Sequence, residues 1–227
     1  MYWHEVLDVW FEQTVKPRRQ GRAFLIRYAD DAVLVFEKEH DARRVMEVLP
    51  KRFTKYGLTL HSEKTRRVPF QRPPRKGSRD DRKVPQGTFD LLGFTHYWGL
   101  SRNGNWVVKR KTAAHRRSRA LKSVAQWCRT HRHRPMIEQW ETLSSKLRGH
   151  YAYYGITGNS HRLGLFHHWT TRIWRKWLDR RSDQARVGWD RFNTWLGRFP
   201  LPTPVVVHSV LRRKPFDPRR LRSETIP

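Results

Sequence analysis

Two adjacent aspartates, Asp30 and Asp31, have the residue types and the spacing that most clearly predict chemistry. They follow Tyr28 between two apolar, β-prone runs, 23–28 and 32–36, which predict a hairpin with both aspartates at its tip. Hard cations such as Mg²⁺ prefer carboxylate oxygens, and two such ions about 3.5–4 Å apart stabilise the attacking and leaving oxygens of a phosphoryl transfer. Aspartate is also common in ordinary solvated turns, so the pair alone leaves both interpretations open.

The segments around this tip predict the elements that hold it in place. Residues 1–20 have the spacing of the end of a helix, and 40–56 that of an amphipathic helix, which Pro50 should kink or split. A second hairpin is predicted where the apolar run 89–98 and the run 106–110 are joined by a turn containing an Asn-Gly pair.

Three helical segments are predicted after a change of composition near Lys111. They cover about 112–129, 135–155 and 159–177, and the middle one has the most regular apolar spacing. Aromatic residues in the second and third segments could stack on unpaired bases. Their spacing of three and four favours a helical core instead for Trp140, Tyr151, Ile173 and Trp177. Prolines at 200, 202 and 204 predict an irregular tail, and the whole pattern predicts an α+β protein.

Positive charge dominates the composition. The chain has 48 Lys and Arg against 20 Asp and Glu, a net charge of +28, which favours a polyanionic partner such as nucleic acid. The stretch 109–134 contains no acid that could form internal ion pairs, so we expect it to contact phosphates. The residues favoured for this role are Lys109, Arg110, Lys111, Arg116, Arg117 and Arg119.

Other classes of protein and compartment fit the sequence less well. No apolar run approaches the ~18–20 residues of a membrane-spanning helix, and no signal peptide is recognisable. Cys128 is the one cysteine, which excludes an internal disulfide and fits a reducing, cytoplasmic location.

Four blocks in order along the chain resemble a known family. Residues 27–31, between two apolar strands, resemble the metal-binding motif of reverse transcriptases, and 57–65 is similar to the next conserved block. Residues 89–94 resemble the hairpin near the primer end, and 147–155 looks like the thumb, or maturase, domain of group II intron proteins. The chain therefore resembles the C-terminal part of a group II intron reverse transcriptase/maturase over most of residues 1–180.

This resemblance implies an RNA-directed DNA polymerase with a two-Mg²⁺ site on Asp30 and Asp31. It implies an incomplete right-hand palm over 1–110, an all-α three-helix thumb or maturase domain over 111–182, and a basic tail over 183–227. The implied partners are intron RNA, a DNA target or primer, and deoxynucleotides. The implied roles are help in splicing and the mobility of the intron.

Further site residues follow from the matched blocks. Lys64 would lie near the active site, where it could protonate or neutralise the departing pyrophosphate, although an ordinary exposed lysine of a basic loop fits equally well. Leu92 and Gly93 resemble primer-grip residues, and a buried strand with a bulge is the alternative. The remaining candidates for contact with nucleic acid are Tyr28, Arg148 and His150.

The sequence differs from the family in lacking a recognisable third metal-binding carboxylate. Relatives carry a first metal-binding aspartate on an upstream palm strand, and none of the acids before Tyr28 (Glu5, Asp8 and Glu12) matches its position. We therefore expect an N-terminally truncated form that is inactive as a polymerase alone, unless dimerisation or another chain completes the site. The alternatives are a non-catalytic RNA-binding, splicing-assistance module, and a fragment whose exposed palm edge prevents stable folding.

Overall fold

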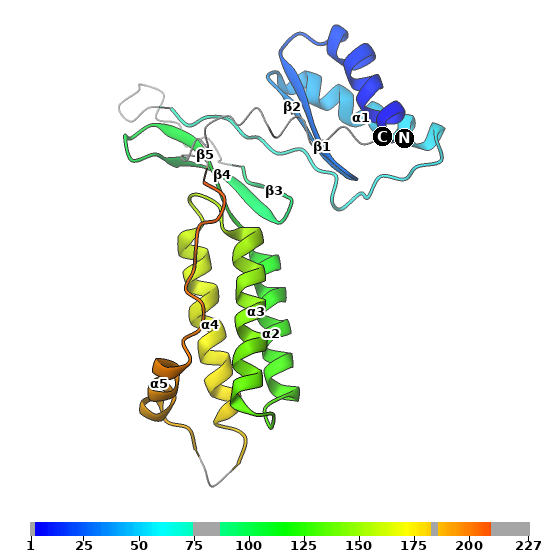
Figure 1. The fold of residues 1–227 in the computed structure, drawn as a ribbon. Helices are drawn as coiled ribbons and strands as arrows, with labels where there is room; N and C mark the ends of the chain where they lie inside the picture. The colour runs from blue at the N-terminus through cyan, green and yellow to red at the C-terminus, as the bar shows by residue number, and fades with distance from the viewer. Residues whose placement is uncertain (1–2, 75–86, 183–185, 210–227) are drawn as a thin grey trace, which may run out of the picture. The chain divides into compact units, whose positions relative to one another are not determined.

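The computed structural model describes residues 3–74, 87–182 and 186–209. The chain divides into two compact units, an N-terminal unit (Met1–Val108) and a C-terminal unit (Lys109–Pro227). The described residues form one two-stranded and one three-stranded sheet together with several helices, as Figure 1 shows. The fold is therefore of the predicted α+β class.

The core of the N-terminal unit lies between an N-terminal helical segment, a hairpin and a helix. The segment consists of π-helical turns, His4–Val9 and Phe11–Val15, followed by a 3₁₀ turn, Lys16–Arg18. Together with helix α1 (Glu39–Lys55) it packs on one face of the hairpin (Figure 1). The buried side chains of this core are Val6, Leu7, Trp10, Phe11, Val15, Ala23, Leu49 and Phe53.

The predicted hairpin is present, with the aspartates at its tip. Strand β1 (Ala23–Tyr28) pairs antiparallel with β2 (Asp31–Phe36), in a register that sets Tyr28 opposite Asp31. Ala29 and Asp30 thus form a two-residue turn. Because side chains alternate along a strand, Ala23 and Leu25 lie against the core while Phe24 and Ile26 are exposed.

Helix α1 does not split at Pro50. It runs as one element of 17 residues with Pro50 inside it. An interior proline costs about 3 kcal/mol or more, because it removes a hydrogen bond and crowds the preceding turn. Leu49 and Phe53, on either side of Pro50, are both buried in the same core, and we infer that their burial offsets this cost.

The second predicted hairpin is part of the three-stranded sheet β3-β4-β5 (Phe89–Leu91, Phe94–Leu100 and Trp106–Thr112). Leu91 pairs with Phe94, so Leu92 and Gly93 form the tight turn between β3 and β4. Both have positive φ, 51° and 76°, as in the hairpin turns whose twist suits antiparallel strands. Neither the predicted buried strand nor the bulge is found at these two residues.

The C-terminal unit is built on three helices close to the predicted ranges. They are α2 (Ala114–Thr130), α3 (Met136–Tyr154) and α4 (Ser160–Leu178). Of the aromatic and aliphatic residues predicted as core, Tyr151 is buried, while Trp140, Ile173 and Trp177 are partly buried against it. Cys128 is also buried in this core, and burial raises the pKa of its thiol to about 12.

The prediction of a basic tail after residue 182 has to be corrected, because part of this stretch packs into the core of the C-terminal unit. Residues 189–198 form a fourth helix, α5 (Trp189–Arg198), whose Phe192 is only 1% exposed. Trp174 of α4 makes edge-on ring contacts with both Phe192 and Trp195. The apolar residues of 192–199 recur at helical spacing, a signal that the neighbouring prolines and arginines obscured. Residues 210–227 lie outside the described part.

Two buried amides connect the elements of the C-terminal unit. The Asn159 side chain, 0% exposed, accepts a bond from the Thr112 backbone N–H (2.9 Å) and donates to the Thr112 hydroxyl (2.8 Å) and the Tyr154 carbonyl (2.9 Å). Gln139 accepts a bond from the Trp174 indole N–H (2.9 Å) and donates to two backbone carbonyls. Because buried amides are costly unless they are bonded, these contacts fix how the elements pack.

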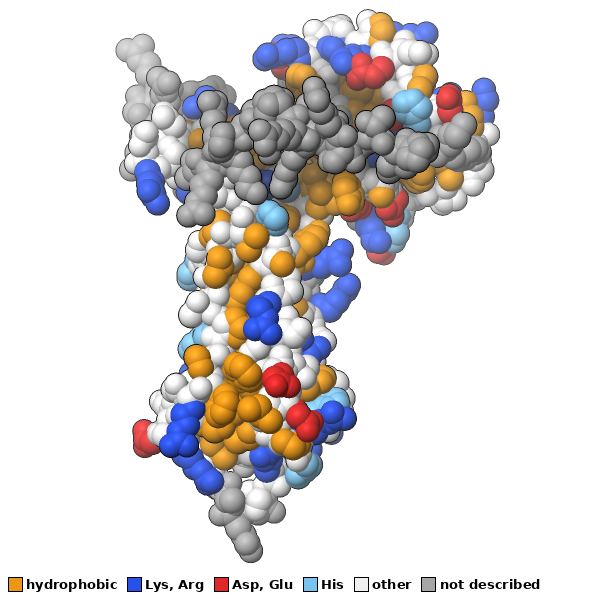
Figure 2. Space-filling view, viewed as in Figure 1, with side chains coloured by type: hydrophobic (Ala, Val, Ile, Leu, Met, Phe, Trp, Pro, Cys, Tyr) orange, Lys and Arg blue, Asp and Glu red, His pale blue; other side chains and the backbone are white. Residues whose placement is uncertain are grey.

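One face of the helical unit combines apolar and basic side chains. Figure 2 shows hydrophobic side chains gathered near the end of the helices that lies lowest in the view, with Lys and Arg side chains beside them.

Among the residues that the structure describes, no helix has the length and apolar character needed to cross a membrane.

The position of α5 leads to a prediction about stability. Replacing Phe192 with Ala should lower the free energy of unfolding of the C-terminal unit by about 3–5 kcal/mol, because a large buried ring is lost and a cavity remains. Chemical denaturation of the full chain measures this change. The matched control is Asn193→Ala, an exposed neighbour on the same helix, and equal stability of the two variants would contradict the packing of α5 into the core.

Candidate active site and nucleic-acid surface

The tip of the β1–β2 hairpin presents two carboxylates that the protein does not use internally. Asp30 and Asp31 are both exposed, and within the described ranges neither carboxylate group accepts a hydrogen bond or forms an ion pair. Tyr28, which precedes the turn, is 67% exposed. The tip therefore leaves carboxylate oxygens and an aromatic ring open to a ligand.

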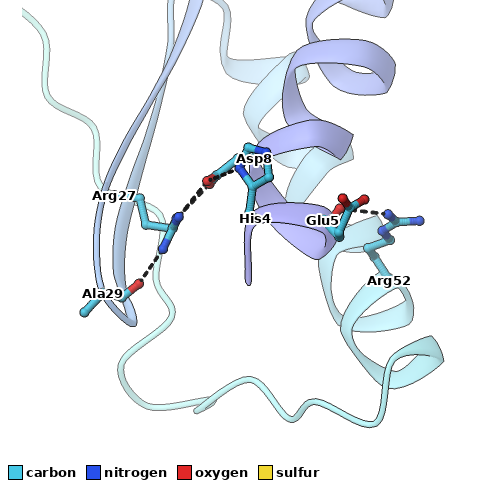
Figure 3. A network of polar contacts seen from close by, with 6 residues as sticks. All are labelled: His4, Glu5, Asp8, Arg27, Ala29 and Arg52. Atoms are coloured by element: carbon cyan, nitrogen blue, oxygen red, sulfur yellow. Dashed lines mark hydrogen bonds and ion pairs between the residues drawn. The ribbon is translucent and has the colours of Figure 1, made fainter. Parts of the chain in front are cut away.

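An arginine holds the backbone of this turn. Arg27 donates from Nη1 to the Ala29 carbonyl (3.0 Å), and Ala29 has a left-handed backbone conformation with φ of 53°. The same guanidinium donates from Nε and Nη2 to the two carboxylate oxygens of Asp8, both at 2.7 Å (Figure 3). Left-handed geometry is unfavourable for alanine, so Arg27 stabilises a turn that its own sequence does not favour.

Asp8 is committed to this contact. Its two oxygens accept from Arg27, and His4 Nδ1 lies 3.2 Å from Asp8 Oδ2. The hydrogen bonds from Arg27 hold the pKa of the Asp8 carboxyl below its usual range, and those from His4 act in the same direction. This charge-assisted pair joins residues 19 apart in sequence, so the sequence analysis missed it.

The aspartate pair supplies the right donor atoms for Mg²⁺ but few of them. Carboxylate oxygens suit this ion, and water and phosphate oxygens ordinarily complete its coordination. Within the part of the chain that the structure describes, no three His, Cys, Asp or Glu side chains are grouped so that they could hold a metal ion. Asp30 and Asp31 therefore fit part of the shell of a hard cation, and no further carboxylate of the described residues joins them.

The other predicted palm residues occupy two further turns. Lys64 is exposed in a short turn, where its backbone N–H donates to the His61 carbonyl (3.1 Å). Its ammonium group forms no ion pair with Asp30 or Asp31 among the described residues. Leu92 and Gly93 occupy the tip of the β3–β4 turn, where glycine brings the backbone close to the surface.

The basic residues predicted to bind phosphate cluster around the start of α2. Lys109, Arg110 and Lys111 lie on β5 and are partly exposed, while Arg116 and Arg119 on α2 are exposed and Arg117 is partly exposed. The first turn of α2 contains no acid. Positive side chains at this end oppose the helix dipole, so a bound phosphate would relieve the repulsion.

The two candidates on α3 differ in their surroundings. Arg148 is exposed. His150 is half-buried, and its ring stacks on Phe166 with centroids 3.8 Å apart and lies 4.6 Å from the Tyr154 ring. Burial lowers the pKa of His150 to about 4, so the imidazole carries no charge for a phosphate near neutral pH. The position of His150 therefore favours packing over the predicted contact with RNA.

The contact between Arg27 and Asp8 predicts how the protein responds to acid. Because the folded state lowers the pKa of Asp8, the stabilisation is fully present above about pH 4 and is lost as the pH falls through the folded pKa. Arg27→Ala should therefore unfold at a lower denaturant concentration than the wild type at neutral pH. Its stability should also fall less than that of the wild type when the pH is lowered. The control is Arg22→Ala, which removes the more exposed pair with Glu37 at the far end of the hairpin. An identical pH dependence in Arg27→Ala and the wild type would contradict this account.

The buried imidazole of His150 predicts a second pH effect. The unfolded chain binds a proton at this residue near pH 6.5 and the folded chain only near pH 4, so the free energy of unfolding decreases as the pH falls between these values. Titration of the His150 ring followed by NMR checks the assignment. A midpoint near 6.5 would show that the ring is not buried, and His150→Gln identifies the resonance.

Comparison with known proteins finds a family match for part of the chain. Residues 2–96 match the family model described as reverse transcriptase (RNA-dependent DNA polymerase). No curated protein and no solved structure matches the chain. The matched stretch contains the N-terminal helical segment, the β1–β2 hairpin and α1, and it ends within β4. The N-terminal unit thus carries a reverse transcriptase domain match over residues 2–96, with Asp30 and Asp31 inside it.

Proposed function

We propose that the chain is part of a reverse transcriptase of group II intron type, with a maturase role in splicing. The observation that carries this proposal is the exposed pair Asp30 and Asp31, at the tip of a hairpin within the stretch that matches reverse transcriptases. Other acids form hydrogen bonds within the protein: Asp8 accepts from Arg27, and Asp41 accepts from the backbone N–H of Gly21. A pair left open beside an exposed tyrosine is what a site for nucleotide and primer requires.

In this proposal the palm residues have the roles that the resemblance to reverse transcriptases implies. Asp30 and Asp31 hold Mg²⁺, which when bound stabilises the charge that develops on the attacking and leaving oxygens. Arg27 keeps the turn in the conformation that presents both carboxylates. Tyr28 provides a ring for the primer end, Leu92 and Gly93 approach its backbone, and Lys64 neutralises the pyrophosphate. Residues 1–110 form the palm in this proposal.

The C-terminal unit is the RNA-binding half. Residues 111–182, extended by α5, form the thumb or maturase domain, and the arginines at the start of α2 contact phosphates of the intron RNA. Their exposure and the lack of acid in the first turn of α2 support this role. Since affinity that depends on phosphate contacts falls steeply with salt, binding should weaken by about 10³–10⁵ between 50 and 200 mM salt if ~6–10 phosphates are contacted.

A second candidate function is a non-catalytic RNA-binding module. It is favoured by one observation, that the described residues place only two carboxylates at the tip and no third one near them. In that case the hairpin is a structural remnant, and the protein acts through its basic surface alone. A dimer, or a second chain that supplies the missing carboxylate, would restore the catalytic alternative.

Metal binding separates the two functions. Binding of Mn²⁺, followed by electron paramagnetic resonance, should be lost in the double variant Asp30→Asn, Asp31→Asn. The matched control is Asp80→Asn, Asp81→Asn, which removes the chain's other adjacent aspartate pair. Equal Mn²⁺ binding by the wild type and the Asp30, Asp31 variant would reject the metal site and leave the RNA-binding module.

The same variants are then compared in primer extension on an RNA template with Mg²⁺, and in binding to a group II intron transcript. We expect both double variants and the wild type to bind this RNA equally, and none of them to extend the primer. Extension by the wild type that is abolished only in the Asp30, Asp31 variant would show that the site is complete, through dimerisation or through a third carboxylate not recognised so far. Failure of the wild type to bind the transcript would contradict the maturase role.

A further inference from the structure

Helices α4 and α5 present a layered set of exposed rings and guanidinium groups. Trp169 on α4 is 47% exposed and Trp189 at the start of α5 is 39% exposed, whereas Trp174 of the same unit is buried. Arg172 lies between them, with its guanidinium carbon 5.8 Å from the Trp169 ring centroid and 5.7 Å from that of Trp189. Arg175 lies 4.4 Å from the Trp189 centroid, on the same helix as Arg172.

The rings are held in place by contacts that do not depend on a ligand. Arg175 Nη1 donates to the Val187 carbonyl (2.9 Å), and the Val187 N–H donates to Asp179 (2.8 Å). The Trp189 ring makes an edge contact with Phe192, which is buried in the core. The segment before α5 is therefore tied to α4, and the Trp189 ring is positioned before any partner binds.

The charges in this set are not neutralised by the protein. Neither Arg172 nor Arg175 forms an ion pair with a carboxylate in the described part of the chain. Lys176, on the next turn of α4, is exposed as well. Two partly exposed indole rings beside unneutralised guanidinium groups complement a flat aromatic group that is attached to an anion. In a chain with a net charge of +28, nucleic acid fits this description better than a protein surface.

We propose that Trp169, Arg172 and Trp189 form a stacking site for an unpaired nucleotide. The base stacks on an indole face, and the arginine contacts the neighbouring phosphate. A base within a duplex cannot use the site, because both of its faces are already stacked. The inference rests on the proposed RNA-binding function of the C-terminal unit and adds to it a preference for single-stranded segments.

The test uses the full-length chain and three probes of one sequence. They are a short single-stranded RNA containing 2-aminopurine, its blunt RNA duplex, and the single-stranded DNA equivalent. Trp169→Ala should weaken binding of the single-stranded RNA by about tenfold and leave the duplex unchanged. It should also remove the fluorescence quenching that stacking on the indole causes. Trp169→Phe keeps a ring and should retain most of the affinity.

The matched control is Ile137→Ala, an apolar residue of α3 that is 46% exposed and lies outside this set. It should bind all three probes as the wild type does. Trp169 is not part of the buried core, so its variants should unfold at the wild-type midpoint. Equal loss for single strand and duplex, or unchanged binding by Trp169→Ala, would overturn the stacking site. No binding of any RNA by the wild type would instead reject the proposed function itself.

Similar effects on single-stranded RNA and DNA would assign the site to unpaired strands of either kind. An effect on RNA alone would assign it to RNA. Either result supports the stacking site, and the comparison shows whether the site prefers RNA over DNA.

Discussion

The shortage of carboxylates is the constraint on which the rest of the structure depends. With 20 acids against 48 Lys and Arg, most of the positive charge has no internal partner. Several of the acids hold a particular contact: Asp8 binds Arg27, Asp41 accepts from the backbone N–H groups of Gln20 and Gly21, and Asp179 accepts from Val187. Self-repulsion on this scale opposes compaction, so cohesion comes from two apolar cores and from any polyanion that binds. Against this background, two adjacent acids without a partner have a meaning that they would not have in an acidic protein.

Much of the fold could be predicted because its signals are local. Alternation and turn residues indicated both hairpins, and apolar spacing indicated α1 to α4 within a few residues. The sequence was ambiguous or misleading where tertiary packing competes with a local rule: it left a kink or a split open at Pro50, and it did not indicate α5. Pro50 stays inside α1 because Leu49 and Phe53 are buried on either side of it, and α5 forms in a region rich in basic residues because Phe192 reaches the core. Neither effect can be recognised without knowing what the helix packs against.

The candidate site residues also divide into those that the local sequence indicates and those that only the fold brings together. Asp30 and Asp31 are neighbours in the sequence, so their proximity was never in question. The contact of Arg27 with Asp8 and the layering of Trp169, Arg172 and Trp189 join residues from different elements, and only the fold brings these together. His150 shows the reverse case: a basic-looking residue beside Arg148 is turned toward Phe166 by the helical register. Sequence can nominate such residues, but burial decides whether they carry charge.

The buried Cys128 has a practical consequence for spectroscopy. It is the one cysteine of the chain, and its thiol is both enclosed and held in the neutral form, which does not react with alkylating reagents. We therefore expect the natural protein not to react with maleimide dyes or thiol-specific nitroxide spin labels. A cysteine engineered at an exposed position, beside the aspartate turn or on α5, would take up the label alone. Distances between such labels would then report on motion of the labelled parts, without the need to remove the native residue from the core.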